Sequence, residues 1–285
     1  MAVSESVYVG RMAPSPTGLL HLGHARTFWI ASERARAANG RLWLRDEDLD
    51  PQRSTASFAE AMRQDLEWLG LRWDAEMRQS ERLGAYRQAA EALLRGGFLY
   101  PCACSRRDLQ QAVHAPHEDT DDEPVYTGRC RPARHGHDGA SELQQGTNYR
   151  FRVPDGETVS FMDARAGKQV FLAGCGREAD FGDFLVLRKD GLPSYQLACV
   201  VDDAAMGITE VVRGRDLLKS TARQILLQRA LRLPTPAYFH CELMRDSAGV
   251  RLAKRHDALS LRALREQGWT PARIVASFAE AGSMR

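Results

Sequence analysis

The sequence predicts an α/β protein with a parallel-sheet core that is interrupted by an inserted module and then resumed. Near the N-terminus, SVYVGR has the composition of a short buried strand, residues 21–38 carry apolar side chains at helical spacing, and RLWLR at 41–45 follows as a second strand. A strand, a helix and a strand within about 40 residues are typical of a parallel βαβ unit. The same alternation returns from about residue 184, after a stretch of different composition.

The other core elements follow from apolar periodicity and end signals. Asn39-Gly40 is a pair that stops the first helix. Amphipathic helices are expected near 55–69 and 82–96, where PQRS and SER supply start signals. The pattern further predicts a strand and a helix within 184–203, a strand at 207–214, a helix from 216 to about 231, and helices at 259–268 and 270–282.

The middle of the chain has a different composition. Residues 101–148 are rich in His, Asp, Gly and Pro and poor in long apolar runs, so we expect loops that are held by something other than a core. Strand-like runs return in YRFRV, TVSFM and GKQVFL. We therefore divide the chain into a first core half, an inserted module, a second core half and a C-terminal segment, at 1–99, 100–183, 184–240 and 241–285.

Composition and charge narrow the class of protein. The chain has 285 residues, a net charge of +2, 44% hydrophobic and 27% charged residues, which is ordinary for a globular protein and does not by itself indicate a nucleic-acid partner. No stretch approaches the roughly 18 apolar residues of a membrane span, and the N-terminus lacks a signal-peptide pattern. We therefore expect a cytoplasmic protein with no membrane partner, whose cysteines are thiols or metal ligands rather than disulfides. Of these, Cys175, Cys199 and Cys241 lie among apolar neighbours and are expected in the core.

The run RMAPSPTGLLHLGHART, residues 11–27, predicts an anion site. The chain leaves a strand, turns through prolines and a glycine, and enters a helix on which His21 and His24 face the same way. Unpaired N–H groups and the partial positive charge at a helix N-terminus stabilise a phosphate, and Gly18 and Gly23 allow close approach. Taken alone, these residues leave open a second interpretation, a turn with two surface histidines.

A second segment far downstream favours the phosphate interpretation. In MRDSAGVRLAKRHDA, residues 244–252 are expected to form a hairpin, followed by a polar loop that carries Lys254 between Arg251 and Arg255. With this pair of segments the chain resembles the class I aminoacyl-tRNA synthetases, in their glutamyl branch. HLGH matches the HIGH motif of that class, and RLAKR is similar to its KMSKS motif. R-x-A-P-S-P-T-G from Arg11, R-x-E-D-x-D from Arg45, VVDD and EVVRG are specific to the glutamate and glutamine enzymes, and the match runs from about residue 7 to 258.

The resemblance implies both an architecture and a reaction. The architecture is a Rossmann-like nucleotide-binding core, an inserted zinc-containing α/β module that contacts RNA, and a short helical C-terminal segment behind the KMSKS-like loop. In the reaction, the carboxylate of glutamate attacks the α-phosphorus of ATP, which gives glutamyl-adenylate and pyrophosphate. The protein positions the reactants and stabilises charge. His21, Gly23, His24 and Lys254 would bind ATP, and both histidines and the lysine, with magnesium, would neutralise phosphate charge.

One departure concerns the second motif. Arg251, Ala253 and Arg255 stand where the KMSKS pattern has Lys, Ser and Ser. A basic loop of this kind can still close on the triphosphate, with weaker or slower catalysis.

Substrate choice follows from charge complementarity. Glutamate offers two carboxylates and one ammonium group, so a selective pocket offers arginines to the former and a carboxylate to the latter. Arg11 and Arg213 each end a predicted parallel strand, where open α/β sheets place ligands. Glu47 would bind the amino group, although its segment also fits a solvated acidic loop that caps the next helix. By resemblance the glutamate-binding set is Arg11, Ala13, Ser15, Glu47, Tyr195 and Arg213.

Three cysteines raise the question of a metal. Cys102, Cys104 and Cys130 cluster in sequence, but a structural zinc normally takes four ligands. The resemblance implies that Tyr126, four residues before Cys130, is the fourth. His114, His117, His135 and His137 compete for that place, and unligated thiols are the alternative.

The C-terminal segment narrows the expected function. Only about 30 residues follow Arg255, whereas glutamyl-tRNA synthetases continue there with a helical anticodon-binding domain. The architecture resembles a stand-alone form of the catalytic core that esterifies glutamate to the queuosine base in the anticodon of tRNA(Asp). Two alternatives stay open, a truncated synthetase that charges tRNA(Glu) and a non-catalytic zinc-stabilised RNA-binding module. We expect a monomer.

Overall fold

The N-terminal half of the core is a parallel βαβ arrangement, as predicted. The computed structural model describes residues 7–104, 125–133, 142–176, 178–244 and 260–283. Strand β1 (Val9–Met12) leads through helix α1 (Leu22–Ala37) to β2 (Arg41–Asp46), and β1 and β2 pair in parallel from Val9–Arg41 to Met12–Leu44. Helix α2 (Ala56–Trp68) then leads to β3 (Ala75–Arg78), which pairs in parallel with β2.

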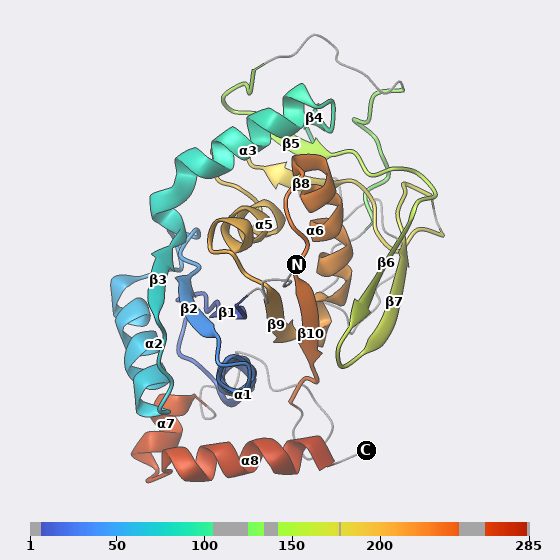
Figure 1. The fold of residues 1–285 in the computed structure, drawn as a ribbon. Coiled ribbons are helices and arrows are strands. Elements are labelled where there is room, and N and C mark those ends of the chain that lie inside the picture. Colours follow the sequence, from blue (N-terminus) through green and yellow to red (C-terminus); the bar gives the residue numbers. More distant parts are fainter. Residues whose placement is uncertain (1–6, 105–124, 134–141, 177, 245–259, 284–285) are drawn as a thin grey trace, which may run out of the picture.

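The C-terminal half of the core places a second set of parallel strands on the other side of β1. Strand β9 (Glu210–Gly214) pairs in parallel with β10 (Ala237–Cys241), and helices α5 (Tyr195–Ala205) and α6 (Leu218–Leu231) flank them. Strand β9 lies beside β1, because the Thr209 N–H donates to the Val9 carbonyl at 2.9 Å. The paired strands form two ladders, β3-β2-β1 and β9-β10-β6-β7, which lie side by side so that β9 neighbours β1 (Figure 1), and the direction of winding reverses between β1 and β9. Open α/β sheets bind ligands at such a switch point.

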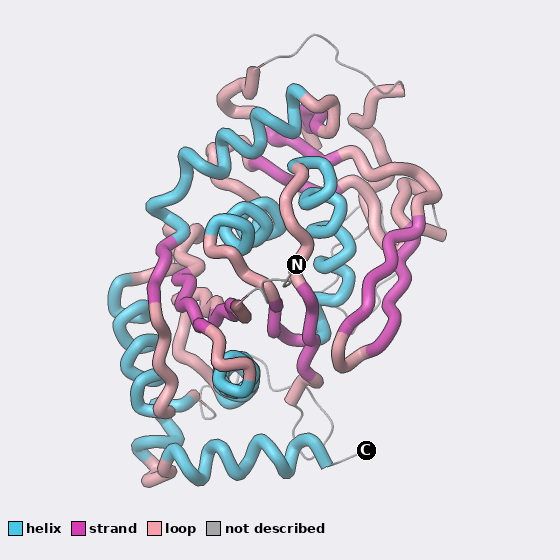
Figure 2. The backbone as a smooth tube through the Cα atoms, viewed as in Figure 1, coloured by secondary structure: helices cyan, strands magenta, loops and turns pink. Residues whose placement is uncertain are grey.

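Between the two halves the chain adds strands of both orientations. Strands β4 (Leu99–Cys102), β5 (Asn148–Phe151) and β8 (Phe184–Leu187) form an antiparallel sheet. A hairpin of β6 (Thr158–Asp163) and β7 (Gly167–Leu172) lies beside α6 and β10 (Figure 2), and Asp163 of β6 is in register with Tyr238 of β10. The described residues within 100–183 contain strands and turns but no helix. Because β8 completes the sheet of β4 and β5, the predicted division at 183/184 cuts through a sheet.

The helices match the predicted ranges closely, but their start signals differ. Helix α2 is capped by Thr55, whose hydroxyl accepts the Phe58 N–H at 3.2 Å, so the predicted PQRS signal ends one residue too early. Helix α3 (Leu83–Arg95) follows a 3₁₀ turn (Gln79–Arg82) and has no side-chain cap. After α1, the residue Asn39 has a φ of +47°, and a Cβ on Gly40 would lie 2.4 Å from the Tyr8 carbonyl oxygen. This turn therefore requires glycine.

Two further helices complete the described chain. Helix α7 (Leu261–Glu266) is capped by Ser260, and α8 (Pro271–Ser283) begins with proline, as predicted. Ile274 and Phe278 of α8 are buried in the same apolar cluster as α1. Cys199 and Cys241 are in the core, whereas Cys175 is only half-buried and accepts a hydrogen bond from Arg131, so its core assignment was wrong. Across the described residues, no helix is long and apolar enough to cross a membrane.

Candidate active site

A pocket of about 450 Å³ lies where the sheet reverses, at the carboxyl ends of β1 and β9. It gathers residues from five separate stretches of sequence, and nine of the residues predicted for ATP or glutamate line it: Arg11, Ala13, Ser15, His21, Gly23, His24, Glu47, Tyr195 and Arg213. Lys254 and the expected hairpin lie outside the described residues. The fold therefore brings together groups that the sequence separates by about 200 positions.

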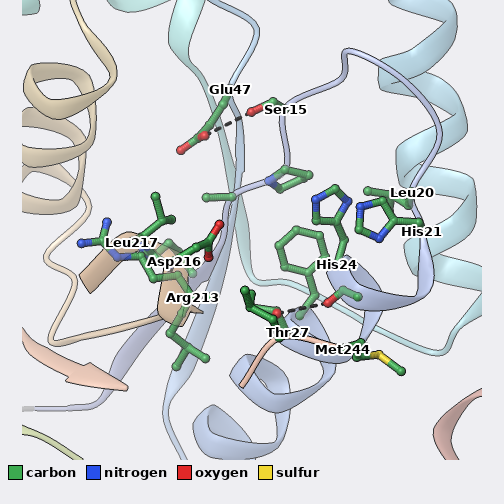
Figure 3. Close-up of a pocket in the computed structure, with 18 of the residues that line it drawn as sticks. Ser15, Leu20, His21, His24, Thr27, Glu47, Arg213, Asp216, Leu217 and Met244 are labelled. Atoms are coloured by element: carbon green, nitrogen blue, oxygen red, sulfur yellow. Dashed lines mark hydrogen bonds between the residues drawn. The ribbon is translucent and has the colours of Figure 1, made fainter. Parts of the chain in front are cut away.

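One wall of the pocket is the N-terminus of α1. His21 is the residue that precedes the helix, in an extended conformation, and its ring stacks on that of His24 with 3.8 Å between the ring centroids. Figure 3 shows these two imidazoles on the side of the pocket opposite Glu47 and Arg213. Because α1 has 16 residues and its first N–H groups lack partners within the helix, this wall suits an anion such as phosphate.

Behind the opposite wall lies a buried network of charges, of which Arg11 reaches the pocket. Asp203 on α5 accepts hydrogen bonds from Arg11 at 3.2 Å and from Arg45 at 2.5 Å. All three residues are at most 5% exposed. The two arginines hold the pKa of Asp203 below its usual range against the opposing effect of burial. Asp203 is therefore ionised, and it fixes Arg11 at the edge of the pocket.

Glu47 presents a carboxylate to the pocket from the loop after β2. Arg45 donates to one of its oxygens at 3.0 Å, and the Ser15 hydroxyl donates to the other at 3.3 Å. The Glu47 N–H donates to the Pro14 carbonyl at 3.0 Å, which ties this loop to the loop after β1. A carboxylate held in this way can accept hydrogen bonds from an ammonium group.

Arg213 presents a buried cation to the same pocket. Its guanidinium donates to Thr221 Oγ1 at 2.7 Å, to His240 Nε2 at 3.3 Å and to the Tyr195 hydroxyl at 3.5 Å. Tyr195 is the first residue of α5 and is 39% exposed. Since none of these three partners carries a negative charge at neutral pH, the charge of Arg213 is available to an acidic ligand.

The predicted metal ligands also converge, at the end of β4. The sulfurs of Cys102, Cys104 and Cys130 lie within 4.8 Å of one another, and the Tyr126 hydroxyl lies 3.6 Å from the first and 3.5 Å from the second. In a tetrahedral zinc site with bonds of about 2.0–2.3 Å, ligand atoms lie roughly 3.5–3.8 Å apart. The four groups therefore fit a structural zinc. The competing histidines His114, His117, His135 and His137 lie outside the described residues.

The electrostatics of this cluster favour a bound cation. Burial raises the pKa of Cys130, but hydrogen bonds with Tyr126 and Cys104 outweigh it and lower the pKa to about 7. The Nε–H of Arg150 donates to Cys102 at 3.3 Å, which stabilises a thiolate. The Tyr126 oxygen accepts the Cys130 N–H at 2.8 Å. Burial raises the pKa of Cys104 and of Tyr126, so a bound metal ion would have to displace the protons of these two groups.

Comparison with known proteins agrees with this geometry. A sequence model of the family described as tRNA synthetases class I (E and Q), catalytic domain, matches residues 7–284. The chain belongs to this family.

The closely similar relatives of this class I synthetase chain carry two different names. It is 48% identical to a glutamyl-Q tRNA(Asp) synthetase of Symbiobacterium thermophilum, over 95% of this chain and 85% of the relative. It is 41% identical to a glutamate–tRNA ligase of Aquifex aeolicus, over 92% of this chain but 54% of that relative. A crystal structure of the Elizabethkingia meningosepticum glutamate tRNA ligase in complex with its amino acid is 27% identical, with a TM-score of 0.71. The match covers 93% of this chain and about half of that ligase, 54%.

Behind the synthetase pocket lie supporting residues that the sequence analysis did not assign. Arg45 and Asp203 lie in the quoted strings R-x-E-D-x-D and VVDD, but no role was predicted for them. A charged residue that directly follows the buried Leu44 in a strand was a usable signal, because such a side chain needs an ionic partner. His240 and Thr221 behind Arg213 carried no comparable signal, since they are single polar residues in apolar segments.

Proposed function

We propose that this protein activates glutamate with ATP and transfers the glutamyl group to the queuosine base of tRNA(Asp). The observation that carries the proposal is the single pocket in which the helix N-terminus with His21 and His24 faces Arg213 and Glu47. A triphosphate on the first wall and glutamate on the second would meet in the middle. The names of the two relatives described above both refer to glutamate, and the name of the more similar one includes tRNA(Asp).

The proposed roles follow from charge. Arg11 and Arg213 bind the carboxylates of glutamate, and Glu47, held by Arg45 and Ser15, binds its ammonium group. His21, His24 and the N–H groups of α1 bind phosphate oxygens, with Lys254 from the second motif. Magnesium, brought by ATP, would neutralise phosphate charge as pyrophosphate leaves. The binding groups lie at the helix end and around the buried charges, so positioning and electrostatic stabilisation account for the chemistry without a covalent nucleophile.

We further propose that Cys102, Cys104, Tyr126 and Cys130 hold a structural zinc that orders the chain around the end of β4, and that the inserted module contacts RNA. Local packing supports the first point, because Tyr100 is the one buried apolar residue of the ligand cluster that is not itself a ligand, whereas Tyr149, Phe151 and Phe181 pack into the main core. Binding of a metal would then contribute to folding.

The decisive experiment compares tRNA substrates. Purified protein is incubated with radioactive glutamate, ATP and magnesium, together with tRNA(Asp) that contains or lacks queuosine and with tRNA(Glu). Label on queuosine-containing tRNA(Asp) alone is the expected result. Label on tRNA(Glu) would instead support the second candidate, a glutamate–tRNA ligase core, which the 41% identity to the Aquifex aeolicus enzyme favours. Absence of glutamate-dependent exchange of pyrophosphate into ATP would contradict both.

A further inference from the structure

The pocket depends on a cation whose support lies behind it. Arg213 is 5% exposed, and a long buried guanidinium keeps one orientation only if its N–H groups have fixed acceptors. Two of the acceptors, Thr221 on α6 and His240 on β10, do not line the pocket. Their own bonding decides where Arg213 points.

The ring of His240 is oriented by a carboxylate on its other side. His240 Nδ1 lies 2.6 Å from Asp163 Oδ2, and the same oxygen accepts the His240 backbone N–H at 3.0 Å. Burial raises the pKa of Asp163, but the Ala166 N–H and the His240 ring outweigh it and lower that pKa. An ionised carboxylate only accepts, so the proton of the ring is on Nδ1. Nε2 therefore carries the lone pair, which faces both Arg213 Nε at 3.3 Å and the Thr221 hydroxyl at 3.0 Å.

His240 is also uncharged at neutral pH. It is 1% exposed, and burial together with the charge of Arg213 lowers its pKa to about 4. The ring thus accepts a hydrogen bond from the guanidinium without neutralising it. Arg11 is held differently, since its partner Asp203 is ionised. Of the two arginines in the pocket, Arg213 retains more of its positive charge for a ligand.

We propose that Asp163, His240 and Thr221 are positioning residues that aim the guanidinium of Arg213 at a carboxylate of the amino acid and so select glutamate over glutamine. This rests on the proposed function. Asp163 is itself fixed by the backbone, because its other oxygen accepts the N–H groups of Arg165 at 3.0 Å and Ala166 at 2.6 Å in the β6–β7 turn. A side chain of the hairpin thereby controls a residue of the pocket that it does not touch.

Four variants test whether Asp163, His240 and Thr221 position Arg213. His240→Leu removes the acceptor, whereas His240→Gln can restore an oxygen near the position of Nε2. In Asp163→Asn, the NH₂ group of the new amide faces either the backbone N–H groups or the Nδ1–H of the His240 ring. This opposition favours the other ring tautomer, in which Nε2 carries the proton and turns an N–H toward Arg213. Thr221→Val removes the shortest hydrogen bond of the guanidinium. Tyr86→Phe is the control, since it loses one buried hydrogen bond, to Asp202 at 2.8 Å, outside the pocket lining.

The readout separates positioning from general damage. In glutamate-dependent pyrophosphate exchange, His240→Leu, Asp163→Asn and Thr221→Val are expected to raise the KM for glutamate about 10- to 100-fold, the loss expected for one hydrogen bond to a charged group. The KM for ATP stays within about twofold, because the phosphate wall is untouched. The preference for glutamate over glutamine falls by a similar factor. His240→Gln recovers most of the loss, and Tyr86→Phe shows none of it.

A second measurement does not depend on catalysis. Nitrogen NMR of the histidine rings in the wild-type protein is expected to show His240 as the neutral Nδ1–H tautomer at pH 7, and calorimetry gives the Kd for glutamate in each variant. An Nε2–H or doubly protonated ring, or a folded His240→Leu protein with unchanged glutamate affinity and selectivity, would overturn the proposal. Glutamate binding without pyrophosphate exchange would contradict the proposed function alone. The Kd values for glutamate in the variants would then decide whether the three residues position Arg213.

Discussion

Replacing Arg213 by glutamine is the sharpest test of the proposal that a positive charge in the pocket binds a carboxylate of glutamate. The substitution keeps a polar side chain, although a shorter one, and removes a buried positive charge whose described partners are Thr221, His240 and Tyr195. All three are neutral, so the loss falls on the ligand rather than on an internal ion pair. The free energy lost in binding glutamate is therefore the quantity to predict.

The size of this free-energy loss follows from the number of hydrogen bonds between Arg213 and the carboxylate. A fork of two charge-assisted hydrogen bonds to a carboxylate, at about 1.5–3 kcal/mol each, contributes roughly 3–6 kcal/mol. At about 1.4 kcal/mol per factor of ten, kcat/KM for glutamate should fall by roughly 10²–10⁴. The value of kcat/KM for glutamine as substrate should fall much less, because the amide of that substrate can pair with the amide of the introduced side chain.

The assay is pyrophosphate exchange with glutamate and with glutamine, at several concentrations of each. Arg34→Gln is the matched control, since Arg34 forms a two-bond ion pair with Glu210 at the other end of the same strand and does not line the pocket. We expect Arg34→Gln to lower the melting temperature without changing the ratio of the two activities. If Arg213→Gln folds and retains the wild-type preference for glutamate, the assignment of Arg213 is wrong.

Three further predictions concern the metal, pH and helix capping. Cys130→Ser should lower the zinc content measured by elemental analysis and lower the melting temperature, whereas wild-type preparations without zinc would contradict the ligand set. Burial raises the pKa of Asp65 to about 6, so its contribution to stability is complete below about pH 4 and is lost as the pH rises through 6. Asp65→Asn should therefore stabilise the fold at pH 7.5, by at most about 3 kcal/mol, and have little effect at pH 4, which thermal unfolding at the two pH values checks. Thr55→Ala removes the cap of α2 and should cost about 1 kcal/mol in denaturant unfolding, and an unchanged midpoint would show that the cap contributes nothing.

Local patterns predicted the elements of the core well. The apolar spacing over 21–38 corresponds to α1, whose bounds are Leu22–Ala37, and Asn39-Gly40 ends it because Gly40 has no room for a side chain. These features are set by neighbours in sequence. Start signals were less reliable, since a threonine one position further on caps α2.

The site was predictable where chemistry repeats a known pattern, and not where it depends on pairing across the fold. Arg11, Glu47 and Arg213 were predicted from motif strings and line one pocket, although their roles stay predictions. Asp163 and His240 are 77 positions apart and meet only because β6 joins the edge of β10. No property of either segment alone reveals that contact.

If Arg213 selects the amino acid as proposed, the hairpin of β6 and β7 gives the inserted region a share in that selection. Asp163 belongs to the stretch that leaves the core at residue 100, yet it anchors the ring behind Arg213. A chimera that exchanges residues 100–183 with a relative would then exchange the Asp163 anchor together with the module that is proposed to contact RNA. Grafts meant to retarget the enzyme to another nucleic acid should retain this aspartate and the turn that holds it.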